Sequence, residues 1–146
     1  MFMLIAAAIV VGLVLPLQAG INAQLRIGLG HPVLAALASF AVGTVALLLL
    51  AAGVRTPLPV SGGLARIPWW QWTGGLLGAG YIAAAVVLAP RLGAATLIAA
   101  VVAGQMIASL VLDHFGWAGF AQHAISGPRL LGAGLVIVGV VVIQRS

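Results

Sequence analysis

The chain has 146 residues, of which 64% are hydrophobic and only 5% are charged, whereas about a quarter of the residues in a soluble domain are charged. Its arginines are scattered singly, without a basic cluster, which argues against nucleic-acid binding, and it has no cysteine for disulfide, thiolate-metal or thiol chemistry. These features exclude a soluble catalytic domain and predict an all-α integral membrane protein.

Five apolar stretches follow along the chain, most of them near the roughly 20 residues that cross a hydrocarbon core. We expect one transmembrane domain, residues 1–146, with spans at residues 2–25, 32–53, 69–89, 92–113 and 129–144. The first stretch carries no charge and is longer than the apolar core of a signal peptide, so we expect it to be retained as a helix.

The breaks between the stretches contain residues that end helices. Residues 26–32 and 55–63 are rich in glycine and proline, and the second of these breaks is the main loop. Residues 90–93 form so short a turn that the third and fourth helices should be antiparallel neighbours, whereas residues 114–128 form a looser connection. No soluble domain fits into any of these breaks.

Three histidines fall in the predicted connections. They are His31, His114 and His123. Their spacing fits no metal site, so we expect them to be solvated and to have no chemical role.

The arginines are evenly divided between the two ends of the predicted helices. With five spans, the sides of the membrane receive three each: Arg55, Arg66 and Arg129 on one, and Arg26, Arg91 and Arg145 on the other. Orientation is normally set by an excess of Lys and Arg in the cytoplasmic loops, so this balance predicts a chain that inserts both ways and forms an antiparallel homodimer. The alternative is that one arginine, such as Arg129, is too embedded to count and a weak bias remains.

A polar stripe follows one face of the first helix. Gln18, Asn22 and Arg26 are four residues apart, and Pro16 lies a turn earlier, where it should bend the helix. Amides inside a membrane need partners, and a stripe that faces the bundle presents donors and acceptors to a substrate. The equally weighted alternative is that Gln18 and Asn22 only hold helices together.

The fourth helix repeats this pattern with Gln105, Ser109 and Asp113. Asp113 is the only acid in the chain, so coupling to a proton or cation through a carboxylate must use it. Because Asp113 ends the predicted span, the alternative is an interfacial carboxylate that pairs with an arginine or caps a turn.

Tyr81 lies in the middle of the third predicted span. Its ring offers an apolar, cation-attracting face, and its hydroxyl needs a partner. Tyr81 is therefore a candidate for lining a pocket, with a packed core position as the alternative.

Several short segments are similar to those of a known family. They are residues 16–25 (PLQAGINAQL), 74–81 (GGLLGAGY), 90–95 (PRLGAA), 103–105 (AGQ) and 113–116 (DHFG). On these segments the chain resembles, over nearly its whole length, the YdcZ-like inner-membrane proteins of the drug/metabolite transporter superfamily. The resemblance implies a bacterial inner-membrane exporter of small molecules that is built like half of a ten-helix, EamA-like transporter. It also implies assembly as an antiparallel homodimer or with an oppositely oriented relative.

The chain departs from the small multidrug exporters of the same superfamily, which use a glutamate in the first helix to exchange protons for cationic drugs. It has no glutamate, which argues against proton-coupled antiport of a lipophilic cation. A neutral or zwitterionic metabolite, or uncoupled passage, stays open.

The sequence thus predicts a small-molecule transporter that works by alternating access, without a cofactor or metal. Its expected substrate-binding residues are Gln18, Asn22, Tyr81, Gln105 and Ser109, with Asp113 as the possible coupling group. The alternative is a non-transporting accessory subunit whose polar residues only join helices. An enzyme is least favoured, because a second carboxylate, a thiol and a serine–base pair are all missing from the sequence.

Overall fold

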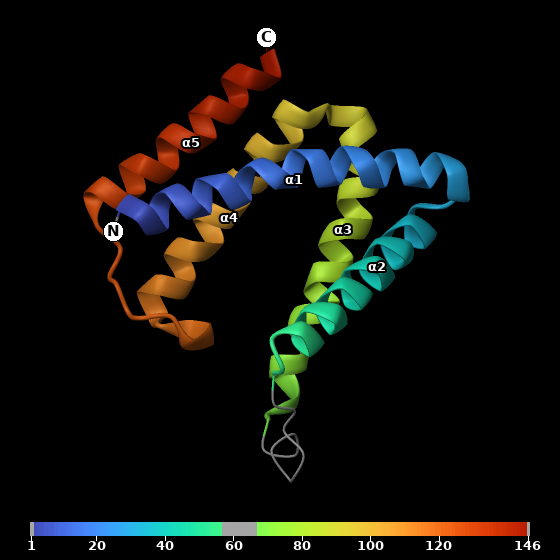
Figure 1. Cartoon of the computed structure of the whole chain (residues 1–146). Helices are drawn as coiled ribbons and strands as arrows, with labels where there is room; N and C mark the ends of the chain where they lie inside the picture. Colours follow the sequence, from blue (N-terminus) through green and yellow to red (C-terminus); the bar gives the residue numbers. More distant parts are fainter. Residues whose placement is uncertain (1, 57–66, 146) are drawn as a thin grey trace. The chain divides into compact units, whose positions relative to one another are not determined.

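The computed structural model describes residues 2–56 and 67–145, which form helices joined by short connections (Figure 1). The elements are α1 (Phe2–Leu29), α2 (Pro32–Gly53), the 3-10 turn η2 (Trp69–Trp72), α3 (Thr73–Leu92), α4 (Ala94–Phe115), the 3-10 turn η3 (Trp117–Gly119) and α5 (Gly127–Arg145). Within these ranges five helices are long and apolar enough to cross a membrane. The all-α class and the five spans are therefore confirmed, while Arg66 and residues 57–63 of the main loop lie outside the described residues.

The helices extend past several of the predicted span ends. Helix α1 continues beyond Arg26 to Leu29, and α4 continues beyond Asp113 to Phe115. The physical reason is that apolar composition marks the thickness of the hydrocarbon core, whereas a helix ends only where the backbone is forced out of its helical conformation. A charged side chain at the membrane edge does not break a helix.

Two glycines set the ends of α4. The break between α3 and α4 is the single residue Gly93, with φ 75° and ψ 162°, a backbone region that is essentially confined to glycine. Gly116 ends the helix in the left-handed conformation, with φ 64° and ψ 31°. The predicted turn at residues 90–93 thus reduces to one residue.

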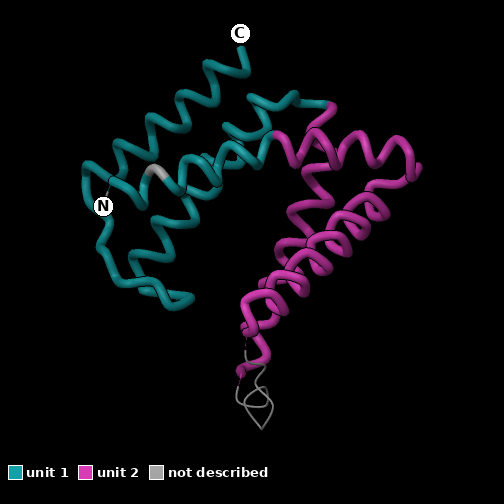
Figure 2. The backbone as a smooth tube through the Cα atoms, in the orientation of Figure 1, with its two compact units in different colours: residues 1–16, 91–146 teal, residues 17–90 magenta. Residues whose placement is uncertain are grey.

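The chain folds as two compact units, shown in different colours in Figure 2. Unit 1 comprises residues 1–16 and 91–146, and unit 2 comprises residues 17–90. The chain passes between the units immediately after Pro16 in α1 and after Pro90 in α3. Since proline has no amide hydrogen, each helix lacks one backbone hydrogen bond there. The expectation of a single domain stays a prediction.

Unit 2 is held together by a small cluster between α2 and α3. Ala35 and Ala36 of α2 are buried together with Ile82 and Val86 of α3, and Tyr81 packs against them. Alanine lets two helix backbones approach closely. In lipid, where the hydrophobic effect does not drive helix association, such close van der Waals packing holds the helices together.

In unit 1, α4 and α5 run side by side in opposite directions (Figure 1). Leu97 of α4 and Ala133 of α5 are buried. The two helices are joined by η3 and by residues 120–126, which turn the chain back at the end of α4.

The rest of the surface is strongly apolar. Leu47, Leu48 and Leu49 are each at least 64% exposed, and because consecutive residues of a helix point in different directions, the C-terminal part of α2 exposes apolar side chains around most of its circumference. A helix that is apolar all round belongs in a membrane, where these side chains meet lipid instead of water.

Candidate functional site

The residues predicted to bind substrate are divided between the two units. Gln18, Asn22 and Tyr81 lie in unit 2, whereas the candidates of α4 lie in unit 1. The idea that all of them line one central site therefore stays a prediction, and each unit is described by itself.

Asn22 is the most unusual polar residue of unit 2. Its side chain is only 4% exposed, and its Nδ2 has no hydrogen-bond partner among the described residues. The buried Ala19 and Ala23 lie on either side of it along α1. A buried amide donor without a partner costs about 1–3 kcal/mol, so its presence calls for an explanation beyond packing.

Gln18, one turn before Asn22, lines a groove of about 230 Å³ in unit 2. The groove is formed by α1, α2 and α3 and is lined by Gln18, Ser39, Phe40, Gly43, Thr44, Leu47 and Ile82. It presents one amide and two hydroxyl groups but no charged group among these seven residues. Such a surface donates and accepts hydrogen bonds without selecting for ligand charge.

Ser39 and Thr44 were not predicted from the sequence as site residues. Single hydroxyl residues in an apolar helix usually satisfy themselves by bonding a backbone carbonyl one turn back, so they form no polar stripe. The available signal was their position on α2 beside Gly43, where a small residue leaves room for a ligand. Only the structure, in which α2 packs beside Gln18, shows that Ser39 and Thr44 line the groove.

Tyr81 is partly buried and packs against the cluster of α2 and α3. Its neighbour Ile82 lines the groove, whereas Tyr81 is not among the residues that line it. The geometry of unit 2 thus corresponds to the core alternative, and a substrate contact by Tyr81 stays a prediction.

A second groove, of about 330 Å³, lies between α4 and α5 in unit 1. It is lined by Met106, Ser109, Leu110, Asp113, Arg129, Gly132 and Ala133. Two predicted residues, Ser109 and Asp113, therefore share one groove. Gln105, one turn earlier, is exposed and is not among the lining residues.

Asp113 forms an ion pair across this groove. The distance from Nη1 of Arg129 to Oδ2 of Asp113 is 3.2 Å, and the two side chains are 36% and 29% exposed. The same nitrogen donates to the carbonyl of His123 at 3.4 Å. This is the arginine pairing that the sequence left open, and a coupling role for Asp113 stays a prediction.

The connection after α4 is fastened to the end of that helix. Nε2 of Gln122 donates to the carbonyl of His114 at 3.0 Å, and the amide of His123 donates to the carbonyl of Asp113 at 2.7 Å. Nδ1 of His114 accepts a hydrogen bond from the amide of Ile125 at 3.3 Å. These bonds position Arg129, which follows on α5, opposite Asp113.

The predicted position of one histidine needs correction, whereas the expectation that the three histidines have no chemical role stays a prediction. His114 does not lie in a connection, because α4 continues to Phe115, and its ring bonds the following segment. His31 caps α2, since its Nδ1 accepts a hydrogen bond from the amide of Val33 at 3.2 Å. The ring of His31 thus takes up one of the backbone donors that the first turn of a helix leaves unpaired. Among the described residues there is no group of three or more potential metal ligands.

Five helices that are long and apolar enough to cross a membrane define a multi-pass helical membrane protein. Residues 3–142 match the family described as "Putative inner membrane exporter, YdcZ". The chain therefore belongs to the YdcZ family, as the resemblance implied, and it is an inner-membrane protein. The family description is that of an exporter, not of an enzyme.

The similarity to a curated relative agrees with membership of the YdcZ family. The inner membrane protein YdcZ of Escherichia coli (strain K12) is 38% identical over 82 residues, which are 56% of this chain and 54% of that relative. The match thus covers about half of the relative's length. No solved structure matches the chain.

Proposed function

We propose that this chain is a small-molecule exporter that works by alternating access as an antiparallel, dual-topology homodimer. The observation that carries the transport function is the polar stripe of α1. Asn22 is buried and its amide nitrogen has no hydrogen-bond partner within residues 2–56 and 67–145. Gln18, one turn away, lines an uncharged groove. Polar groups inside membrane helices are costly and mark substrate pathways.

The chemistry of the groove in unit 2 favours a neutral or zwitterionic solute. Gln18, Ser39 and Thr44 offer donors and acceptors but no carboxylate that would attract a cation. The proposed substrate-binding residues also include Asn22, Tyr81, Gln105 and Ser109, as predicted from the sequence.

Alternating access is supported by the positions of two prolines. The chain crosses between the units at Pro16 and Pro90, each inside a helix. A missing backbone hydrogen bond makes a helix easier to bend at that point. Pro16 and Pro90 thus give α1 and α3 each a position at which the helix can bend during transport.

The antiparallel dimer is supported by the balance of arginines. Arg129 pairs with Asp113, but acidic residues contribute little to orientation, so the pairing does not remove Arg129 from the count. Two opposed copies would give a ten-helix assembly with a two-fold axis in the membrane plane, like an inverted-repeat transporter.

Flux measurements on a glutamine pair test this proposal. Neutral and zwitterionic metabolites are screened by thermal shift on purified protein, and those that bind are followed by flux into proteoliposomes. We expect Gln18→Leu to abolish flux while the dimer persists, and Gln24→Leu to retain it, because Gln24 is exposed on the same helix and is not among the groove residues. Gln105→Leu tests the contribution of α4 in the same way.

The accessory-subunit alternative predicts a different result. If Gln18 only joins helices, Gln18→Leu dissociates the dimer, as measured by size-exclusion chromatography with light scattering. Dissociation, or equal flux through the Gln18→Leu and Gln24→Leu variants, would contradict a substrate-binding role for Gln18.

A further inference from the structure

The ion pair between α4 and α5 has donors and an acceptor that no other described residue uses. The guanidinium of Arg129 makes two contacts, to Asp113 and to the carbonyl of His123, and both are made by Nη1. Within residues 2–56 and 67–145, its other nitrogens and Oδ1 of Asp113 have no hydrogen-bond partner. Both side chains are partly exposed, at 36% and 29%. The groove therefore offers one positive and one negative group side by side.

The groove changes from charged to apolar along its length. Leu110 and Met106 lie three and seven residues before Asp113 on α4, which at about 1.5 Å per residue places them roughly 4 and 10 Å further along the helix. On α5, Gly132 and Ala133 follow Arg129 and leave space between the helices. A ligand that fits has a charged head and an apolar chain.

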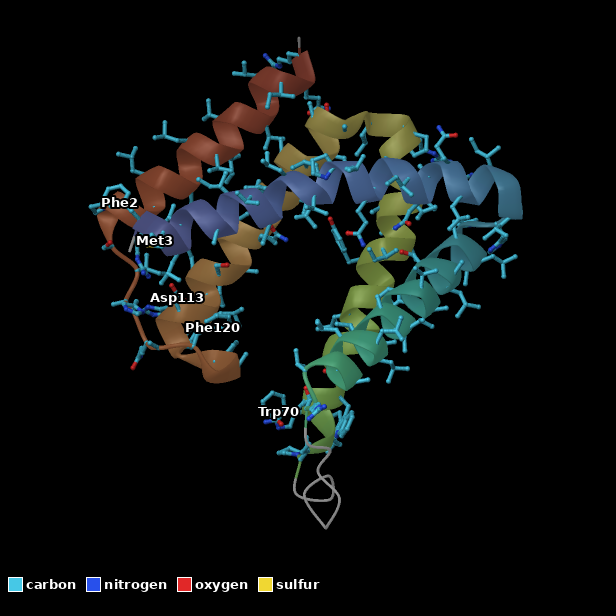
Figure 3. All side chains as sticks on the ribbon, viewed as in Figure 1. Phe2, Met3, Trp70, Asp113 and Phe120 are labelled. Carbon is cyan, nitrogen blue, oxygen red and sulfur yellow. The ribbon has the colours of Figure 1, made fainter. Side chains whose placement is uncertain are left out.

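The charged end of the groove lies where phospholipid headgroups are expected. Asp113 lies near the end of α4, and Phe120 lies on the connection that follows (Figure 3). Trp117 in this connection is 57% exposed, and exposed tryptophans gather at the membrane interface. The apolar end of the groove then points into the hydrocarbon core.

We infer that this groove binds the headgroup and the first part of an acyl chain of phosphatidylethanolamine. A guanidinium suits a phosphate because its planar donors match two phosphate oxygens, and the free carboxylate oxygen of Asp113 accepts N–H bonds from a primary ammonium. The two protein charges are adjacent, as are the two charges of the headgroup. This inference does not depend on the proposed transport function.

The same chemistry discriminates between headgroups. Phosphatidylcholine carries a quaternary ammonium that cannot donate a hydrogen bond to Asp113, and phosphatidylglycerol has a phosphate but no cation, so Asp113 repels it. We expect phosphatidylethanolamine to bind about tenfold more tightly than phosphatidylcholine, which corresponds to one charge-assisted hydrogen bond.

Thermal unfolding in detergent with added lipid tests the inference. The full chain is purified in micelles, and its unfolding temperature is titrated with dioleoyl phosphatidylethanolamine, phosphatidylcholine or phosphatidylglycerol. We expect the unfolding temperature of wild type to rise at concentrations of phosphatidylethanolamine about tenfold lower than those of phosphatidylcholine. Asp113→Asn and Arg129→Gln should remove this preference, and Arg145→Gln, a change of the same charge at the opposite end of α5, should leave it intact. Comparing lipids within each variant separates lipid preference from any loss of stability.

Equal responses of wild type to phosphatidylethanolamine and phosphatidylcholine would overturn the inference, as would a preference that persists in both Asp113→Asn and Arg129→Gln. Free O-phosphoethanolamine, the headgroup without a chain, distinguishes a lipid from a soluble zwitterion. We expect it to have no effect at the lipid concentrations used. If it binds as tightly as the lipid, the apolar part of the groove is not involved and the lipid assignment fails.

Discussion

Asn22 separates the two roles that a polar residue has inside a membrane. Asn22→Leu replaces a buried amide whose Nδ2 lacks a partner among the described residues with an apolar side chain of similar size. Because the unpaired donor costs about 1–3 kcal/mol, we expect the unfolding temperature to stay the same or rise while flux is lost. Tryptophan fluorescence during thermal unfolding and proteoliposome flux measure the two effects.

A structural role predicts the opposite sign. If Asn22 joined helices by hydrogen bonds, its removal would lower stability by about 0.6–2 kcal/mol. A lower unfolding temperature together with normal flux would exclude Asn22 from the substrate pathway. Gln24→Leu, on the exposed side of α1, is the control for a change of amide to leucine.

At the residue scale, the sequence predicted the polar positions better than their partners. Four-residue spacing places polar residues on one helix face whatever the fold is, but it does not show which of them line a groove. Gln18 and Ser109 do, whereas Asn22 and Gln105, on the same faces, do not. Pairing of Asp113 with an arginine was one of the predicted alternatives. Which arginine forms the pair could not be predicted, because the position of Arg129 depends on how the connection is bonded to the end of α4. Ser39 could not be predicted, since its role depends on its neighbours in space.

At the scale of helices, Pro16 and Pro90 are the positions at which we expect the stiffness of α1 and α3 to affect transport. Pro16→Ala and Pro90→Ala restore a backbone donor inside α1 and α3, and the change is worth up to about 3 kcal/mol per helix. We expect higher unfolding temperatures and slower flux. Pro32→Ala is the control, because Pro32 occupies the first turn of α2, where proline interrupts no hydrogen bond.

Unchanged flux in both Pro16→Ala and Pro90→Ala would contradict bending at these positions. A loss of flux in Pro32→Ala would instead point to a general sensitivity of the protein to proline replacement. Measuring unfolding and flux on the same preparations distinguishes these cases.

The helices themselves were predictable, because a long apolar stretch in lipid must satisfy its backbone internally and therefore forms a helix. The residues at which the helices end were less predictable. The first span was predicted to end at Leu25, whereas α1 continues to Leu29, because hydropathy reports membrane thickness and not backbone conformation. The reduction of the turn at residues 90–93 to Gly93 likewise depends on a backbone angle that composition does not specify.

On the scale of the whole molecule, the division of the chain into units was not predictable from the sequence. The helices are apolar on most sides, as α2 shows, so hydrophobic periodicity does not indicate which faces meet. The cluster that contains Ala35 and Val86 depends on small residues that occur throughout the chain. Family membership, by contrast, was predictable from short segments such as residues 16–25 and 90–95.

The balance of arginines predicts that a single substitution sets the orientation. Arg91→Gln leaves an excess on the side of Arg55, so the C-terminus should face outward in most copies. Arg55→Gln leaves the excess on the other side, and the C-terminus should face the cytoplasm. Cysteine labelling at the C-terminus measures both, and identical labelling of the two variants would show that these arginines do not control insertion.

The most direct test of the proposed assembly is the orientation of the unmodified sequence. Ser146→Cys introduces one cysteine into a chain that has none, and intact cells are labelled with an impermeant maleimide before and after permeabilisation. The antiparallel homodimer predicts that about half of the copies are labelled from outside. If all copies face one side, the dual-topology homodimer is contradicted, and an oppositely oriented relative becomes the required partner.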